Sequence, residues 1–222
     1  MKIAVVIPAY NAGETLPLLL KETSRFIGKK DIIVVDDGSK DNTSKVVQQE
    51  GVVLLSHQKN QGKGAALVTG FVYALKQGYE AVITLDADGQ HRPSYIPQFI
   101  KQTKNKDSDI VVGSRRHDLK GMPFDRFLTN RITAIVVSLL GGVKIEDSQS
   151  GYRLIKTKVL QSVPILTHRY EAEDELLIKA GRKRYIISSI FIPTIYGTEK
   201  SHINKILDTL LFIVLAIKSL WQ

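Results

Sequence analysis

Short runs of β-branched residues alternate with stretches of helical spacing through the first half of this 222-residue chain. The runs are typical of buried strands, and between them apolar residues recur every three or four positions, as on one face of a helix. This alternation favours an α/β fold, in which helices flank a mostly parallel sheet. The pattern predicts strands at 2–8, 31–37, 52–56, 80–86 and 109–114, and helices at 14–27, 41–50, 62–78 and 94–104.

The alternation loosens after residue 114, where one long helix is predicted over 122–142. Two more helices are expected at 171–183 and 204–221, with a strand at 185–193 between them. The sequence contains no repeats, low-complexity tracts or linkers that would separate domains. A single domain over 1–222 is therefore expected, consisting of a first half (1–114), a more variable second half (115–203) and a C-terminal helix (204–222).

The composition narrows the classes of partner. A net charge of +9 is compatible with nucleic acid, an anionic membrane or phosphorylated ligands. Nucleic acid is not expected, because only 7% of residues are aromatic and no RNP, zinc-finger or basic-zipper pattern is present. The absence of cysteine excludes disulfides and thiolate metal sites and favours a reducing compartment. No apolar run reaches the roughly 18–20 residues that span a bilayer.

Polar residues follow four of the predicted strands at the point where each strand ends. They are Pro8 to Asn11, Asp36 to Ser39, Asp86 to Asp88, and Gly113 to Arg116. In open parallel sheets, ligands bind at the carboxyl ends of the strands. These four segments are therefore expected to form one binding edge.

The segment Gly62-Lys63-Gly64 opens a predicted helix but is not a P-loop. A P-loop needs glycine where His57 stands and Ser or Thr where Gly64 stands, and the third glycine of a dinucleotide fingerprint is also missing. Two interpretations remain. The helix start could accept a phosphate or sugar oxygen with Lys63 nearby, or it could be an ordinary helix-start turn.

Asp86, Asp88 and Gln90 offer only oxygen ligands, which suits Mg²⁺ or Mn²⁺. A lone pair of aspartates at this spacing usually marks a turn, but its position after a buried strand favours a metal site. Asp36 can accept hydrogen bonds from a base or ribose, although an acidic surface turn is the alternative.

Four arginines occupy a short stretch with few acids, at positions 115, 116, 126 and 131. Guanidinium groups bind phosphate oxygens through two parallel hydrogen bonds. Because most charge runs are solvated faces, one or two of the four are expected to bind phosphate.

Seven segments resemble glycosyltransferase family 2, and most of all its dolichyl-phosphate mannosyltransferase branch, which includes bacterial polyprenyl-phosphate sugar transferases. In chain order they are "VVIPAYNAGETL", "IIVVDDGSKDNT", "NQGKGAAL", "LDADGQH", "VVGSRR", "DSQSGYRL" and "IPTIYGTEKSH". The resemblance implies a GT-A fold and inverting transfer of a hexose from a GDP- or UDP-sugar to a polyprenyl phosphate, with Mg²⁺ or Mn²⁺. It also makes 1–114 the half that binds the nucleotide sugar and 115–203 the acceptor side.

The resemblance also implies roles for individual residues, carried over by position. Those expected to contact the nucleotide sugar are Pro8, Tyr10, Glu14 and Asp36, with Asp37 and Lys63 close by. The metal and the diphosphate would be surrounded by Asp86, Asp88 and Gln90. The acceptor phosphate would meet Arg115 and Arg126, with Asn130 one helical turn after Arg126, and the diphosphate would be covered by Lys200 and His202. Asp88, Arg115 and Arg126 are expected to be catalytic.

The need for a general base depends on the acceptor. A lipid phosphate is already an anion at pH 7, so arginines that position it are enough. A hydroxyl acceptor needs a base, for which Asp147 is the first candidate and Glu173 the second; the alternatives are a loop acid and an exposed helix acid. A soluble family 2 enzyme acting on a saccharide or protein hydroxyl is therefore the second hypothesis, and a non-catalytic nucleotide-binding module is the third.

The C-terminal helix is apolar over residues 210–217, with Trp221 near its end. This pattern suits a helix lying in a membrane interface, and the alternatives are packing on the core, an oligomer interface or truncation before membrane helices. The expected location is the cytoplasm, peripheral at the inner face of the membrane.

Overall fold

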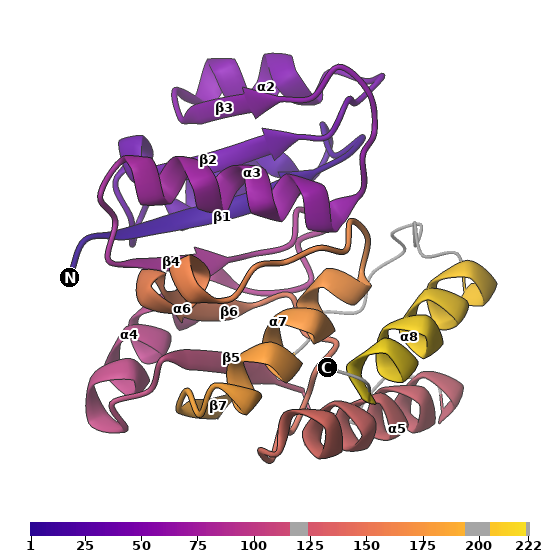
Figure 1. Ribbon diagram of the computed structural model, residues 1–222. Helices are drawn as coiled ribbons and strands as arrows, with labels where there is room; N and C mark the ends of the chain where they lie inside the picture. The colour runs from indigo at the N-terminus through magenta and orange to yellow at the C-terminus, as the bar shows by residue number, and fades with distance from the viewer. Residues whose placement is uncertain (116–123, 194–204, 221–222) are drawn as a thin grey trace.

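A seven-stranded sheet forms the centre of the computed structural model, which describes residues 1–115, 124–193 and 205–220 (Figure 1). The order of strands across the sheet is β3-β2-β1-β4-β6-β5-β7. From the first half of the chain come β1 (Ile3–Ala9), β2 (Ile32–Asp36), β3 (Val53–Ser56), β4 (Ala81–Thr84) and β5 (Ile110–Ser114). From the second half come β6 (Arg153–Lys156) and β7 (Ile187–Phe191).

The sheet is mostly parallel, with one reversed strand. Strands β3, β2, β1 and β4 pair in parallel, and so do β5 and β7. Strand β6 lies between β4 and β5 and is antiparallel to both. Strands β4 and β5 therefore run in the same direction, and their carboxyl ends point to the same edge as those of β1 and β2.

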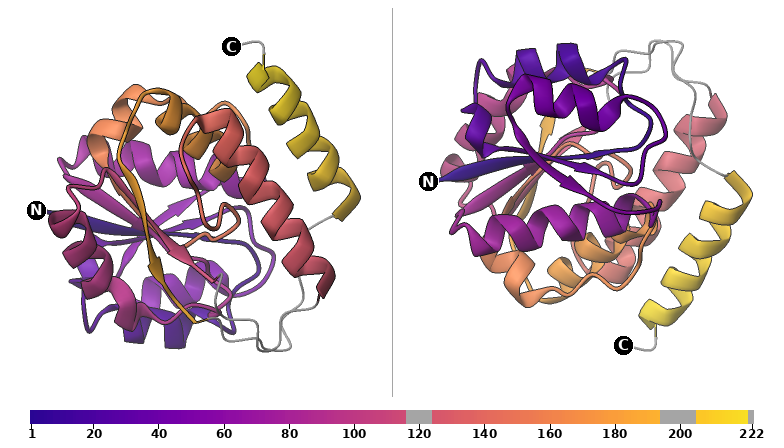
Figure 2. Two further views of the ribbon diagram at one scale, coloured as in Figure 1. Left: turned by 90° about the horizontal axis from the view of Figure 1, so that it is seen from below. Right: turned by 90° about the horizontal axis from the view of Figure 1, so that it is seen from above.

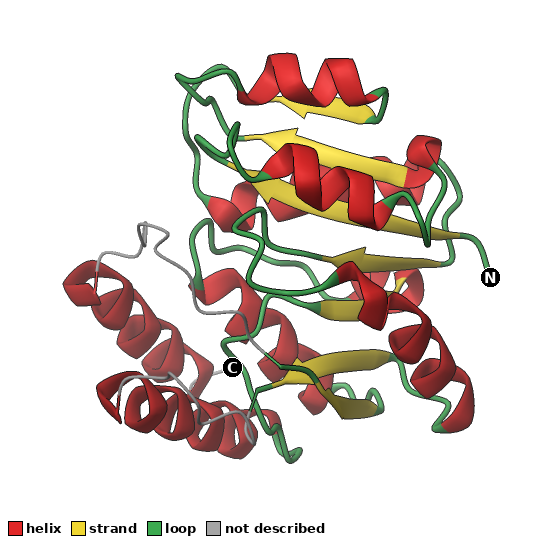
Figure 3. Ribbon diagram, turned by 180° about the vertical axis from the view of Figure 1, so that it is seen from behind, coloured by secondary structure: helices red, strands yellow, loops and turns green. Residues whose placement is uncertain are grey.

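Helices cover both faces of the sheet (Figures 2 and 3). One face carries α1 (Leu16–Thr23), α2 (Thr43–Glu50) and α4 (Ile96–Asn105). The other face carries α3 (Lys63–Lys76), α5 (Phe124–Gly141), α6 (Thr157–Ser162) and α7 (Glu171–Arg182). Successive residues of a strand point to the two faces in turn. Val5 packs in the core under α1, α2 and α4, and Val6 packs in the core under α3, α5, α6 and α7. Such strands are buried on both sides, which explains their continuous apolar runs.

The last described helix, α8 (Lys205–Leu220), packs against α5 and α7 at the outside of the molecule. In both views of Figure 2 it lies beside α5. Within the described residues, no helix has the length and apolar character needed to cross a bilayer.

The predicted α/β class with a mostly parallel sheet is confirmed, and each predicted strand and helix is present with ends shifted by a few residues. Strand β6 and helix α6 were not predicted. Strand β6 has only four residues and includes a charged one, Arg153, so it shows neither a continuous apolar run nor a clear alternation. Its burial depends on the neighbouring strands β4 and β5, which a local pattern does not reveal.

Candidate active site

Polar segments from β1, β2, β4 and β5 meet at the carboxyl edge of the sheet. Asp36 is paired with Ala9 in the register of β1 and β2, and the Asp37 amide donates to the Ala9 carbonyl at 2.8 Å. The Leu85 amide, just after β4, donates to the Val6 carbonyl at 3.1 Å. The structure therefore brings together the strand ends that the sequence indicated.

The loops after β1 and β2 are tied to each other on the side of this edge where the nucleotide is predicted to bind. The Asn11 amide donates to Ser39 Oγ at 2.9 Å, and the Lys40 amide donates to Asn11 Oδ1 at 2.8 Å. Of the predicted nucleotide contacts on β1 and the loop that follows it, Pro8 is buried, Tyr10 is half-buried and Glu14 is exposed.

Asp36 and Asp37 are buried, and both carboxylates organise neighbouring loops. Asp36 accepts hydrogen bonds from the Ser39 amide at 2.9 Å and from the Ser44 hydroxyl. Asp37 accepts from the amides of Gln61 at 2.9 Å and Gly62 at 2.8 Å. Asp37 thus fixes the segment that leads into α3, while nucleotide contact by either aspartate remains a prediction.

The two glycines that flank Lys63 allow α3 to approach α7 closely. A Cβ on Gly62, whose φ is 101°, would lie 2.5 Å from the His168 carbonyl oxygen, and one on Gly64 would lie 2.6 Å from the Cβ of Ala172. Side chains at either position would force the two helix starts apart. The glycines therefore have a packing role, and binding of a phosphate or sugar oxygen at this helix start stays a prediction.

Lys63 lies between two carboxylates. Its Nζ is 2.7 Å from Oδ1 of Asp86 and 2.9 Å from Oε2 of Glu173. Burial alone would lower the pKa of Lys63, but the two acids outweigh it and hold the pKa above its usual value. The same lysine keeps Asp86 ionised, because its charge outweighs burial and leaves the pKa of that carboxyl below normal.

The predicted metal ligands lie in the segment that follows β4. The backbone N–H of Gln90 donates to Asp88 Oδ1 at 2.9 Å across a turn in which Gly89 has a φ of 72°. Gly151, in the segment before β6, leaves room for Asp86, because a Cβ there would overlap the Asp86 carboxylate.

Among the described residues, no group of three or more His, Cys, Asp or Glu side chains could enclose a metal. Two carboxylates and an amide nevertheless fit Mg²⁺ or Mn²⁺, because Mg²⁺ usually keeps several waters and shares substrate phosphates instead of filling an all-protein cage. The donor set therefore suits a cation that arrives together with a diphosphate.

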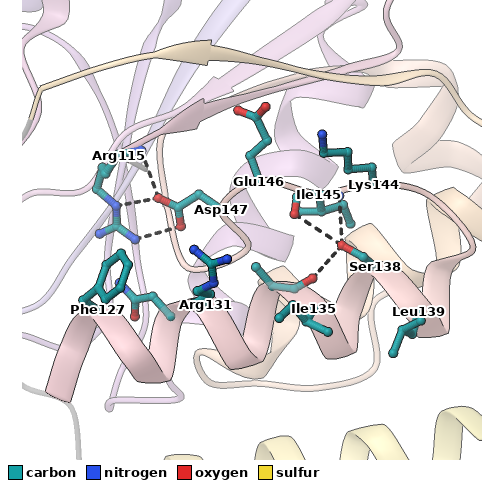
Figure 4. A pocket seen from close by; sticks show the side chains of 12 residues that line it. Arg115, Phe127, Arg131, Ile135, Ser138, Leu139, Lys144, Ile145, Glu146 and Asp147 are labelled. Carbon is teal, nitrogen blue, oxygen red and sulfur yellow. Dashed lines mark hydrogen bonds and ion pairs between the residues drawn. The ribbon is translucent and has the colours of Figure 1, made fainter. Parts of the chain in front are cut away.

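A cavity of about 330 Å³ lies between α5 and the segment 144–147 (Figure 4). At one end, Arg115 and Asp147 point toward each other. The Arg115 guanidinium donates to both carboxylate oxygens of Asp147, at 2.8 and 2.9 Å, and the Arg115 amide donates to Oδ2 at 3.1 Å. Although burial alone would raise the pKa of Asp147, the arginine and backbone bonds keep it below normal. These contacts tie Asp147 to Arg115, and its predicted role as a general base stays a prediction.

Helix α5 forms one wall of the cavity with two stripes of i, i+4 spacing. One stripe is Phe127, Arg131, Ile135 and Leu139, and the other is Asn130, Ala134 and Ser138. The structure therefore places the predicted Asn130 in this lining together with Arg131, one of the four arginines among which one or two phosphate-binding residues were expected. The i, i+4 spacing within the predicted helix was the signal that could have identified the stripe.

Three predicted site residues cannot be compared with the structure. Arg126 is part of α5, but its side chain lies outside the described part of the chain. Lys200 and His202 both lie in the segment 194–204, which is also outside the described residues. Their predicted contacts with acceptor and diphosphate stay predictions.

The start of α7 carries buried acids at positions 171, 173 and 174. Glu173 is therefore not the exposed helix acid that was one alternative, since it is buried and paired with Lys63. Burial, together with neighbouring carboxylates, raises the pKa of Asp174 to about 7. Arg153, which the sequence did not single out, donates to the carbonyls of Ser148, Ser150 and Glu173 and so fixes the start of α7.

Comparison with known proteins adds three findings. The family model described as Glycosyl transferase family 2 matches residues 4–164. UDP-N-acetylglucosamine–dolichyl-phosphate N-acetylglucosaminyltransferase of Methanococcus voltae is 34% identical, covering 90% of this chain and 87% of its own. Undecaprenyl-phosphate mannosyltransferase of Micrococcus luteus is 28% identical, covering 74% of this chain and 70% of its own.

Among solved structures, glucosyl-3-phosphoglycerate synthase from Mycobacterium tuberculosis, in complex with Mn²⁺, UDP and phosphoglyceric acid, superposes with a TM-score of 0.76. It is 20% identical, and the match covers 98% of this chain and 78% of that one. This likeness confirms the expected GT-A fold. The family-model match and the relative from Methanococcus voltae confirm the expected family. The chain belongs to glycosyltransferase family 2.

Proposed function

We propose that this glycosyltransferase transfers a hexose, with inversion, from a GDP- or UDP-sugar to a polyprenyl phosphate at the cytoplasmic face of a membrane. The observation that carries the proposal is the cavity on α5, which combines charged residues, among them Arg115, Arg131 and Lys144, with an apolar wall beside the sheet edge. The names of the relatives, which act on dolichyl and undecaprenyl phosphate, support the same acceptor class.

The cavity matches an amphiphile with an anionic head. Arg115, Asn130 and Arg131 supply cationic and amide donors, as a phosphate requires. Farther along α5, Ala134, Ile135 and Leu139 supply an apolar wall that suits an isoprenoid chain. Ile135 and Leu139 are 52% and 77% exposed, so the apolar wall extends to the molecular surface.

The cationic end of the cavity lies close to the predicted donor site. The charge of Arg115 is near enough to contribute to the lowered pKa of Asp86. An acceptor phosphate held by Arg115 would therefore lie near a sugar whose diphosphate is bound at Asp86 and Asp88.

The chemistry follows from this placement. A divalent cation held by Asp86, Asp88 and Gln90 would supply positive charge to the departing nucleoside diphosphate. Acceptor phosphate is anionic at pH 7 and needs no strong base, so orientation by Arg115 is sufficient. In this scheme Asp147 acts as a positioning residue, which agrees with its two-point ion pair.

Membrane contact is the second part of the proposal. Exposed apolar side chains of α5 and α8, called here the outer face, are Leu128, Ile132, Ile135, Leu139, Leu207, Leu210, Ile213, Val214, Ile217 and Leu220. Exposed apolar side chains gathered on two neighbouring helices are typical of a site of interaction with protein or membrane. Exposed Arg131 on α5 and Lys218 on α8 lie among these residues in the sequence, which favours an anionic lipid surface.

A panel of donors and acceptors tests the proposal. GDP-mannose, UDP-glucose and UDP-N-acetylglucosamine are each offered with undecaprenyl phosphate, undecaprenol or free sugars, with Mg²⁺ or with a chelator. We expect metal-dependent transfer from one donor to undecaprenyl phosphate and none to undecaprenol, which lacks the phosphate. Transfer to free sugars but not to the lipid phosphate would overturn the proposal and support the soluble hydroxyl-acceptor hypothesis.

A further inference from the structure

Lys63 connects three elements that meet at the candidate active site. It is the first residue of α3, it contacts Asp86 just after β4, and it contacts Glu173 in the first turn of α7. Asp86 and Glu173 are thus both held by one ammonium group. The contact with Glu173 spans 110 residues of sequence.

The charges around Lys63 are unbalanced. It faces two carboxylates, and Oε1 of Glu173 is buried with no hydrogen-bond partner among the described residues. A buried carboxylate without compensation is costly, so removal of the lysine would leave a strong local excess of negative charge. A divalent cation at Asp86 would satisfy part of the same excess, which makes Lys63 and that cation alternatives.

We propose that Lys63 is an internal counter-ion that neutralises Asp86 in the metal-free protein and competes with a divalent cation for that carboxylate. When the cation binds, the lysine pairs with Glu173 alone. This inference rests on the proposed function only in placing a cation at Asp86. It assigns Lys63 a positioning role in addition to its predicted place near the nucleotide sugar.

The proposed bridge couples cation binding to helix α7. Arg153 donates to the Glu173 carbonyl at 2.7 Å and to the Ser148 carbonyl at 2.7 Å, so the helix start and the segment before β6 are held together. A stronger Lys63–Glu173 pair would stabilise this arrangement when the cation site is filled.

The test measures Mn²⁺ binding by electron paramagnetic resonance without nucleotide or lipid. Because loss of a nearby positive charge favours a cation, Lys63→Met is expected to bind Mn²⁺ about tenfold more tightly than the unaltered protein. In Glu173→Gln the positive charge of Lys63 is balanced by Asp86 alone. This variant is therefore expected to bind Mn²⁺ about threefold more weakly than the unaltered protein. Lys59→Met removes an exposed lysine of the preceding loop and is expected to stay within about twofold.

Thermal unfolding with and without Mn²⁺ gives a second readout. Without the cation, Lys63→Met should unfold at a lower temperature than the unaltered protein. Addition of Mn²⁺ should raise the unfolding temperature of Lys63→Met more than that of the unaltered protein. Unchanged or weaker Mn²⁺ binding by Lys63→Met would overturn the proposal, as would tighter binding by Glu173→Gln. If Lys63→Met does not fold, Lys63→Gln and Glu173→Gln carry the test with the same opposite signs. Because lipid and sugar are absent, these results are independent of the acceptor panel.

Discussion

At the carboxyl edge of the sheet, Asp37 and Asp86 are buried or half-buried and paired, whereas on the outer face of α5 and α8 apolar side chains are exposed. Asp37 is 3% exposed and accepts two backbone hydrogen bonds, and Asp86 is paired with Lys63. By contrast, Leu139 is 77% exposed and Leu220 is 72% exposed. The Arg115–Asp147 pair and the cavity on α5 separate the two regions.

The difference indicates how the two proposed substrates would be recognised. Buried charges are costly unless partners are fixed in advance, so the sheet edge is organised before a polar ligand binds. Exposed apolar surface gains free energy only when something removes it from water, at about 25 cal/mol per Å². The sheet edge is therefore suited to a nucleotide sugar from solution, and the outer face to an acceptor that stays in a lipid phase.

The largest expected effect concerns the sheet edge. Asp88→Ala removes a predicted metal ligand and should lower the transfer rate by about 10²–10³-fold at saturating Mg²⁺, since charge stabilisation of the leaving group is lost. Initial rates over a Mg²⁺ series measure this loss. Undiminished activity with metal present would break the assignment of Asp88 to the donor site.

The next prediction separates donor from acceptor. Arg131→Ala removes a cation from the cavity but leaves the sheet edge intact, so the KM for lipid phosphate should rise about tenfold while the KM for the nucleotide sugar stays constant. The matched control is Arg25→Ala, an exposed arginine just after α1 on the other face of the sheet. Equal changes in both KM values would contradict a separate acceptor cavity.

A smaller effect is expected on membrane binding. Leu210→Ser on the outer face should weaken binding to vesicles that contain anionic lipid by about fivefold, because one exposed leucine no longer enters the lipid interface. Hydrolysis of the nucleotide sugar in solution should not change. Leu18→Ser alters a leucine that is 65% exposed on α1 and serves as control; equal losses in sedimentation with vesicles would show that the outer face has no special role.

The last prediction concerns the pH dependence of folding stability and involves neither substrate nor membrane. The pKa of Asp174 is about 7 in the folded protein and 3.8 without its surroundings, so between these values the folded state keeps a proton that the unfolded state loses. Stability should therefore fall by about 1 kcal/mol per pH unit as pH rises through this window, with no further loss from this group above pH 7. Asp174→Asn has no proton to lose at this position. The free energy of unfolding of the variant, relative to that of the unaltered protein, should therefore be higher at pH 8 than at pH 5. Urea unfolding at both pH values measures this gain, and an equal difference at both would contradict the raised pKa.

The order of strands and helices could largely be predicted because strands buried on both faces appear as continuous apolar runs. Strand β6 could not, because its four residues include Arg153 and its place in the sheet depends on β4 and β5. The polar groups at the strand ends were predictable for a related reason. Position after a buried strand is a local property, and the direction of parallel strands then places those groups at one edge.

The contacts made by these groups were not predictable in the same way. Lys63 reaches Glu173 only because Gly62 and Gly64 let α3 pack against the start of α7. The ion pair between Arg115 and Asp147 likewise joins two loops separated by 32 residues. Such pairs follow from tertiary packing, so their sequence neighbourhoods carry no signal for them.

The products formed from a nucleotide sugar and undecaprenyl phosphate in vesicles show whether the sugar is transferred to the lipid phosphate. Mass spectrometry of the lipid and chromatography of the nucleotide identify which bond is broken. We expect a lipid that carries one phosphate and one sugar, released together with a nucleoside diphosphate. A nucleoside monophosphate with a lipid diphosphate sugar, or no lipid product with any donor, would contradict hexose transfer to the lipid phosphate.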